Sequence, residues 1–422
     1  MNISKLLTDD SAVENFIRET LRKAVYEPVN GQDGSDDDAQ TKRKSSASDI
    51  FIVANAGIAF KYHGRLEWPY GDGKPDDHNM IDDSRKDAET FQRERIQKEE
   101  NGCVSFRDAE KLVRAIYRIA FSSPAAAQER ARHEQALITL GDDDFSFSLA
   151  NIGRFRCNAY RQRGSLACTL RVFPFGLPDF SRMHYPPQVT DLARLQQGLI
   201  LVTGQAGSGK STTLAHLIDQ INHDPSRSGH IITVEDPIEY IYKHGYSVIS
   251  QREVEHDTET FASALKAVLR QAPNVILVGE MRDFETIQTA VTAAETGQLV
   301  LSTLHTLDVA NTVDRIIDVF PPLQQQQIRM QLSMVLKAVV SQEMVDAFAP
   351  DGSKIRVPLF EVMRIDSSIA PLIRTGRTQQ LGNYFKYNTG NGMLTRDACR
   401  RQLEAAGIRF ADEDRVESSG KD

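Results

Sequence analysis

The sequence predicts an α/β protein with a mostly parallel sheet in its second half and an α+β domain before it. Between residues 198 and 306, four short aliphatic and β-branched runs alternate with helical segments: LILVTG, HIITVED, VILVGE and LVLSTLHT. Alternating buried strands and helices are typical of a parallel sheet covered on both faces. Further upstream, FSFSLANIGRFRCNAYRQRGSLACTLRVFP alternates apolar and polar residues in three short runs, which predicts antiparallel strands.

The other elements of the first half follow in chain order. Residues 10–26 carry apolar side chains near helical spacing, which predicts a short amphipathic helix. Residues 27–48 are rich in Gly, Ser and charge and bury too little apolar surface to offset their ordering entropy, so we expect a linker. Residues 49–69 predict two strands, 71–102 a charged solvated insertion, and 106–121 a second helix.

Several prolines between 174 and 187 mark a boundary between the α+β pattern before them and the parallel α/β pattern after them. Beyond residue 345 the pattern becomes mostly helical, and the last dozen residues are polar. We therefore expect an N-terminal helix and linker (1–44), an α+β domain (45–185), a parallel α/β domain (190–345), a small helical C-terminal region (346–410) and a polar tail (411–422).

Composition and charge exclude several classes of protein. With 40% hydrophobic and 26% charged residues among 422, the chain is neither wholly disordered nor fibrous. Its net charge of -8 gives no general attraction to nucleic acid or to an anionic bilayer. No apolar run reaches the ~18 residues that span a membrane, and no signal peptide is visible, so we expect a cytoplasmic protein without an integral membrane segment. The 4 cysteines are scattered and predict neither a zinc site nor a disulfide framework.

The clearest chemical signal is GQAGSGKST, which matches G-x-x-x-x-G-K-[ST] directly after a predicted strand and before a predicted helix. Glycines let successive backbone N–H groups face a phosphate, and the helix N-terminus adds partial positive charge. Lys210 is expected to reach the β- and γ-phosphates, and the Ser211 hydroxyl to ligate Mg²⁺. A plain glycine turn is the alternative, which the full spacing and context disfavour. The predicted nucleotide-binding residues are Gly204, Gln205, Ala206, Gly207, Ser208, Gly209, Lys210, Ser211 and Thr212.

Acidic residues follow two further strands of the parallel domain. Glu235 and Asp236 end HIITVED, and Glu280 follows VILVG. Ligands of open parallel sheets bind at the carboxyl ends of the strands, where a carboxylate can polarise the attacking water or hold Mg²⁺. Because Gly279 stands where a metal-holding Asp is common, we expect Mg²⁺ to depend on Ser211, the phosphates and Glu235 or Asp236. A helix cap or a solvated acid is the alternative for each, and it suits Glu280 least.

The last predicted strand of the parallel domain ends in polar residues, Thr303, His305 and Thr306. A lone histidine is more often a structural residue, but this one follows an apolar strand in the same series as the phosphate loop. The position predicts that His305 senses the γ-phosphate or relays a proton.

The four motifs stand in one order: GQAGSGKST, ITVEDPIEY, VILVGEMRD and LSTLHTLDVANTVDRIIDVFP. In this order they resemble the secretion-ATPase superfamily, and most closely the twitching-motility (type IV pilus retraction) ATPases. The resemblance is specific from about 198 to 345 and weaker from 45 to 180 and from 345 to 405. It implies a homohexameric ring of ATP hydrolases, each with a PAS-like N-terminal domain and a RecA-like P-loop core, and with ATP bound between the two.

The resemblance also implies roles for individual residues. The family's Asp-box acids fall on Glu235, Asp236 and Glu239, its catalytic glutamate on Glu280, and its His-box histidine on His305. Arginines of the N-terminal domain that approach the phosphates in such enzymes fall on Arg156, Arg171 and Arg163, and an arginine clamp offsets charge on the transferring phosphoryl group. A solvated strand arginine is the alternative for each of the three.

A motor that converts ATP hydrolysis into domain motion is what the resemblance implies for function. It would power pilus retraction, secretion or conjugation at the cytoplasmic face of the inner membrane, attached peripherally through a platform protein of the machine. Residues 368–375 match the family's retraction motif only at Ile369 and at 372–374, so retraction, assembly and secretion stay open.

Three other functions stay open as well. One is a RecA-like nucleic-acid translocase, against which the acidic charge and the lack of a basic, aromatic strip argue. A small-molecule kinase would leave the TLHT and EDPIE segments without a role. The third is a nucleotide-binding ring partner that regulates another motor.

Overall fold

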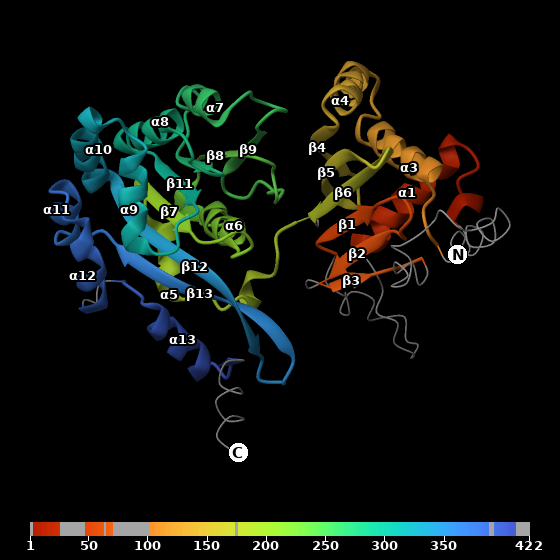
Figure 1. Cartoon of the computed structure of the whole chain (residues 1–422). Helices are drawn as coiled ribbons and strands as arrows, with labels where there is room; N and C mark the ends of the chain where they lie inside the picture. The colour runs from red at the N-terminus through yellow and green to blue at the C-terminus, as the bar shows by residue number, and fades with distance from the viewer. Residues whose placement is uncertain are drawn as a thin grey trace. The chain divides into compact units, whose positions relative to one another are not determined.

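The computed structural model describes residues 3–25, 47–62, 65–70, 102–173, 176–387 and 392–410. The chain divides into two compact units, Met1–Phe175 and Gly176–Asp422 (Figure 1). Most of the predicted linker at 27–48 and of the charged insertion at 71–102 lies outside the described residues, as does the whole polar tail at 411–422.

Over its described residues, the first unit is an antiparallel sheet with three α-helices. Its six strands lie in the order β3-β2-β1-β6-β5-β4. The strands are β1 (Asp49–Ile52), β2 (Ala59–Tyr62), β3 (Arg65–Glu67), β4 (Asp142–Leu149), β5 (Gly153–Gln162) and β6 (Ser165–Phe173), and the helices are α1 (Asp10–Val25), α3 (Phe106–Ala120) and α4 (Ala127–Leu140).

Helical spacing of apolar residues explains how α1 and α3 join this sheet. Val13 and Ile17 on α1, and Leu112 and Ile116 on α3, are fully buried in the same core as the inward-facing residues of β5. The Ser105 hydroxyl caps α3 by accepting a hydrogen bond from the Asp108 N–H at 3.2 Å. The two predicted helices and the three antiparallel strands are confirmed.

The second unit is a larger, mostly parallel sheet with the strand order β13-β12-β7-β11-β10-β8-β9, and β14 pairs with β12. Among the described strands of this sheet, only β13 and β14 pair antiparallel, and both pair with β12. The strands are β7 (Gly198–Thr203), β8 (His230–Glu235), β9 (Val248–Glu253), β10 (Val275–Val278), β11 (Leu299–Leu304), β12 (Leu336–Phe348), β13 (Lys354–Arg364) and β14 (Arg409–Phe410).

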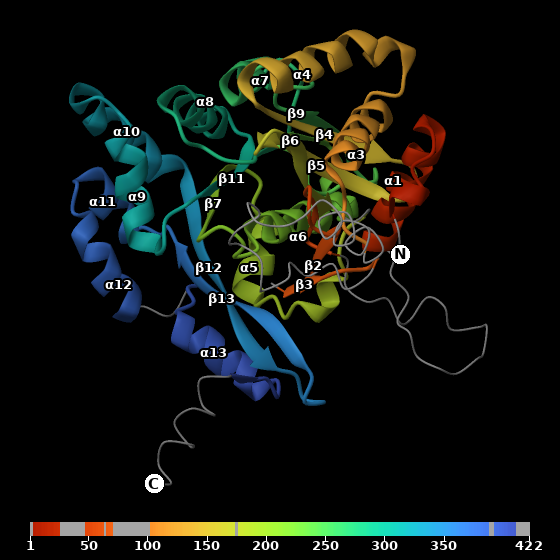
Figure 2. The ribbon, with the colours of Figure 1, turned by 45° about the vertical axis from the view of Figure 1, so that its right-hand side comes forward.

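Helices cover both faces of this sheet, as Figures 1 and 2 show. Leu199 and Leu201 of β7 pack in the core with α7 to α12, whereas Ile200 and Val202 pack in the core with α5, α6 and α13. Because successive strand residues face opposite sides, a continuously apolar strand serves both cores. The helices are α5 (Pro187–Thr190), α6 (Lys210–Asn222), α7 (Phe261–Val268), α8 (Phe284–Glu295), α9 (Val309–Asp318), α10 (Pro322–Val335), α11 (Ile369–Arg374), α12 (Leu381–Tyr387) and α13 (Arg396–Ala405).

The structure confirms the four predicted parallel strands, corrects two other expectations and adds a helix that was not expected. The 49–69 stretch holds three strands, not two. The 346–410 stretch is not mostly helical at its start, because β12 continues into it and Lys354–Arg364 adds a further strand to the large sheet. Helix α4 was not expected, since only His133 and Leu137 of its side chains are buried. None of the described helices is long and apolar enough to cross a membrane.

Candidate functional site

The phosphate-binding sequence forms a loop from the end of β7 to the start of α6, as predicted. Gly204, Gly207 and Gly209 all have positive φ, at 147°, 77° and 88°, which is why glycine occupies these positions. An added Cβ on Gly204 would lie 2.2 Å from the backbone oxygen of Gln342, whereas one on Gly207 would meet nothing within 4 Å. The loop is therefore packed against β12 on one side and open on the other, where the N-terminus of α6 can receive an anion.

Lys210 reaches back into this loop. Its Nζ donates to the carbonyl oxygens of Gly204 and Gln205 at 2.9 and 3.0 Å, and the side chain is largely buried. Burial lowers the pKa of Lys210, while the nearby Glu239 and Glu280 carboxylates act in the opposite direction. Lys210 thus lies between the loop predicted to bind the phosphates and the glutamate predicted to activate the attacking water.

The two residues after Lys210 differ in their contacts. The Ser211 hydroxyl makes no hydrogen bond to any residue that the structure describes, so its oxygen can serve as a ligand for Mg²⁺. The Thr212 hydroxyl lies 2.9 Å from the hydroxyl of Tyr240 and so ties the start of α6 to the segment after β8.

The sheet order brings the other predicted motifs together. Strands β7, β11, β10 and β8 are consecutive neighbours and parallel, so the segments that follow them leave the same edge. The Nε2 of His305, after β11, lies 3.5 Å from Oε2 of Glu280, after β10. The Arg282 Nε lies 2.8 Å from the same oxygen. Glu280 therefore lies between a histidine and an arginine, and both contact the same carboxylate oxygen.

Hydrogen bonds from the buried end of β11 fix the backbone before Glu280. The Thr303 hydroxyl donates to the Gly279 carbonyl at 2.6 Å, and the Ser302 hydroxyl donates to the Val278 carbonyl at 2.8 Å. Both donors are buried. The carboxylate is thus carried on a segment that cannot shift independently of the strand that carries His305.

Glu235 and Asp236 lie in different surroundings, although they are consecutive. Glu235 is buried, and desolvation raises its pKa to about 7, with Gln251 Nε2 donating to Oε1 at 3.4 Å. Asp236 is exposed. Over the described residues, no cluster of acids, histidines and cysteines is arranged to hold a metal ion. The donors that fit Mg²⁺ here are the Ser211 hydroxyl and phosphate oxygens, and the role given to Asp236 stays a prediction.

The predicted arginines all belong to the first unit. Arg156 makes two bonds to the Asp144 carboxylate at 3.0 and 3.1 Å, and Arg171 pairs with Asp49 at 3.3 Å. Arg163 lies at the exposed tip of the β5–β6 hairpin with φ of 47°. All three lie on or beside the sheet, and their approach to a phosphate stays a prediction.

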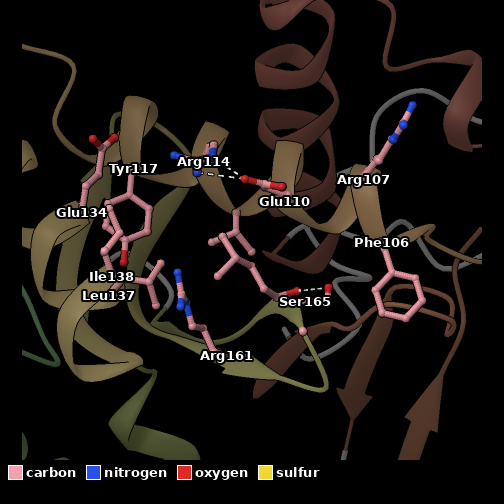
Figure 3. Close-up of a pocket in the computed structure, with 13 residues that line it drawn as sticks. Phe106, Arg107, Glu110, Arg114, Tyr117, Glu134, Leu137, Ile138, Arg161 and Ser165 are labelled. Atoms are coloured by element: carbon pink, nitrogen blue, oxygen red, sulfur yellow. Dashed lines mark hydrogen bonds and ion pairs between the residues drawn. The ribbon is translucent and has the colours of Figure 1, made fainter.

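Figure 3 shows a cavity of about 360 Å³ in the first unit, between α3, α4 and the β5–β6 hairpin. Tyr117 lines it, and the Tyr117 hydroxyl donates to the buried Asp143 at 2.8 Å. Arg114 and Glu110 pair across its upper edge, and Arg161 projects into it. Its described lining holds no lysine and no phosphate-loop sequence, so the loop between β7 and α6 is the candidate site.

Two residues near this site were missed in the sequence. Arg282 could have been found, because it is two residues from Glu280. Gln342 could not, because it lies on β12, and only the sheet order places that strand against the phosphate loop.

Comparison with known proteins places the chain in one family. The family model described as type II/IV secretion system protein matches residues 180–401. A twitching motility protein of Neisseria gonorrhoeae is 42% identical over 265 residues, covering 63% of this chain and 70% of the relative. The type IV pilus retractation ATPase PilT of Pseudomonas aeruginosa is 39% identical over 267 residues, covering 63% and 76%.

Solved structures are similar over more of the chain. The crystal structure of the pilus retraction motor PilT with bound ADP is 37% identical with a TM-score of 0.68, covering 87% of this chain and 91% of that one. The Legionella pneumophila ATPase DotB, at 24% identity, has a TM-score of 0.66 and covers 89% and 92%, a likeness of fold alone.

Proposed function

The chain belongs to the type II/IV secretion system protein family, and we propose that it is a motor ATPase that powers pilus retraction or a related secretion machine. The observation that carries the chemistry is the 3.5 Å approach of His305 to Glu280 beside a glycine loop whose lysine interacts electrostatically with that glutamate. Membership of the family supports a role in a pilus or secretion machine, and the geometry of the site supports ATP hydrolysis.

Each group in the site has a role in this proposal. The N–H groups of the loop and Lys210 hold the phosphates and neutralise their charge. Ser211 would hold Mg²⁺, which polarises the γ-phosphate when bound. Glu280 accepts the proton of the attacking water. His305 lies close enough to Glu280 to orient the carboxylate, and its role as a γ-phosphate sensor follows from the resemblance. Glu235 lies at the end of the adjacent strand.

The remaining roles rest on the resemblance and on the names of relatives. They include a homohexameric ring, a PAS-like first unit ahead of a RecA-like core, domain boundaries near 45, 185 and 345, and charge supplied by Arg156, Arg171 and Arg163. A peripheral position at the cytoplasmic face of the inner membrane, on a platform protein, belongs to the same proposal.

Replacing Glu280 with Gln tests the chemistry. The variant keeps the shape of the side chain but cannot accept a proton, so we expect ATP binding to persist while turnover falls by about 100-fold or more, the range for general-base catalysis. Phosphate release and binding of a fluorescent ATP analogue separate the two effects, with Glu259→Gln, an exposed glutamate of the same unit, as the matched control. Hydrolysis at the wild-type rate in Glu280→Gln would show that the catalytic base is another group.

The machine is tested in the native host by replacing Lys210 with Ala in the only copy of the gene. More surface pili than in wild-type cells would mean that the motor retracts them. Fewer would mean that it assembles them, and an unchanged count would favour secretion or conjugation.

A further inference from the structure

We infer that Gln342 is a positioning residue that turns one peptide of the phosphate-binding loop toward the nucleotide. The inference rests on the proposed function, because it presupposes that the loop binds a nucleoside phosphate. Gln342 lies on β12, about 130 residues beyond the loop in sequence, and belongs to none of the motifs described above. Its side chain is buried, with 3% of its surface exposed.

Both ends of the Gln342 amide are bonded to the loop and its helix. Nε2 donates to the carbonyl oxygen of Ser208 at 2.6 Å. Oε1 accepts from the Thr213 hydroxyl on α6 at 2.7 Å. The carbonyl of Ser208 can only accept a hydrogen bond, so the reversed amide would face it with a second acceptor. The geometry therefore selects this one orientation and uses the donor and acceptor of a glutamine together.

The bond to Ser208 also sets the direction of the next N–H group. In a planar trans peptide, the carbonyl of one residue and the N–H of the following residue point in opposite directions. Because Gln342 holds the Ser208 carbonyl toward β12, the Gly209 N–H points away from β12, toward the open side of the loop. This N–H makes no hydrogen bond to any residue within the described ranges, so it is free to bind a phosphate oxygen.

Close packing makes the arrangement specific. A Cβ atom added to Gly204 would lie 2.2 Å from the backbone oxygen of Gln342, and one added to Gly209 would lie 2.8 Å from the Gln342 Nε2. Two of the three glycines of the loop with positive φ thus lie directly against this one residue. The neighbouring Ser341 hydroxyl donates to the Leu307 carbonyl at 2.8 Å, in the segment that follows His305. Consecutive residues of β12 therefore hold both the phosphate loop and the His305 segment.

The test uses the full chain and a fluorescent ADP, N-methylanthraniloyl-ADP, as the probe. In Gln342→Glu, the introduced carboxylate places an acceptor against the Ser208 carbonyl. Losing this bond and opposing two acceptors weakens ADP binding by about 10- to 100-fold at pH 8. When the introduced carboxyl is protonated, its O–H can again donate to Ser208, so the ratio of variant to wild-type Kd falls toward one as the pH is lowered to about 5.5.

Two further variants separate orientation from packing. Gln342→Met fills the same volume without either hydrogen bond, and we expect weaker ADP binding with a Kd ratio that does not change with pH. Gln327→Glu makes the same substitution on the exposed surface of α10 and is expected to bind ADP like the wild type. If Gln342→Glu does not fold, a raised KM with little change in kcat for Gln342→Met supports the same role.

The outcomes are distinct. A wild-type protein that does not bind the fluorescent ADP refutes the proposed function itself. A wild-type protein that binds it, together with a Gln342→Glu variant that binds equally well or with a pH-independent ratio, refutes the positioning role alone.

Discussion

The burial of Glu235 predicts how the stability of the folded chain changes with pH, and by how much. The carboxyl is buried at the end of β8, and its pKa is raised from 4.5 to about 7, chiefly by desolvation. The folded chain therefore keeps a proton that the unfolded chain releases between these two values. A shift of this size corresponds to about 3 kcal/mol between the two protonation states. The sign follows directly: folded-state stability falls as the pH rises from 4.5 to about 7 and is not recovered above it.

Replacing Glu235 with Gln removes the titration and keeps the shape of the side chain. We expect the variant to be more stable than the wild type at pH 8 and nearly equal to it at pH 4.5, with the difference reaching about 3 kcal/mol. Hydrogen exchange of the β8 amides, in the absence of nucleotide, gives the opening free energy of this strand at each pH. Differences between the two proteins cancel the contributions of all other titrating groups.

The control is Glu259→Gln, which removes one exposed negative charge from the same unit. If the difference between Glu235→Gln and the wild type does not change with pH, Glu235 does not hold a proton near neutrality, and the reasoning from desolvation is wrong.

Two further predictions concern the backbone of the site. Gly204→Ala places a Cβ 2.2 Å from the Gln342 backbone oxygen at φ of 147°, so we expect loss of fluorescent ADP binding, with far-UV circular dichroism as the check on folding, and normal affinity would contradict the packing argument. Thr303→Val removes the 2.6 Å bond to the Gly279 carbonyl, so we expect kcat to fall by about 10-fold without loss of ADP affinity. The control Thr292→Val removes a hydrogen bond on the exposed face of α8 and is expected to leave kcat unchanged.

The parallel core could be predicted from the sequence because its strands are buried on both faces. β7 is apolar at every position between Gly198 and Thr203. Directly before a phosphate-loop motif, such a run is best explained as a buried parallel strand. β12 could not be predicted in this way. Gln342, Glu343 and Asp346 interrupt its apolar pattern, and the buried Gln342 is tolerated only because partners distant in sequence satisfy its amide.

Motif spacing predicted candidate residues for the chemistry, but it could not give their surroundings. Glu235 and Asp236 are adjacent in sequence, yet one is buried and the other exposed. Burial depends on the packing of the segment after β8, where the Ile238 N–H bonds the Glu253 carboxylate of the neighbouring strand at 3.0 Å. A contact of this kind depends on strand order, which a single sequence does not contain.

The same strand order explains how widely separated segments can form one site. Buried side chains of β11 and β12 bond the backbone of neighbouring segments, through Thr303 to Gly279, Ser341 to Leu307 and Gln342 to Ser208. Bonds between buried groups are screened little by solvent and are costly to leave unmade. Because β12 bonds both the phosphate loop and the segment after His305, a displacement of the loop strains the bond to that segment. In the same way, β11 links the His305 segment to the backbone before Glu280. In a motor this makes the core the stiff part, so that motion driven by hydrolysis must be taken up outside it.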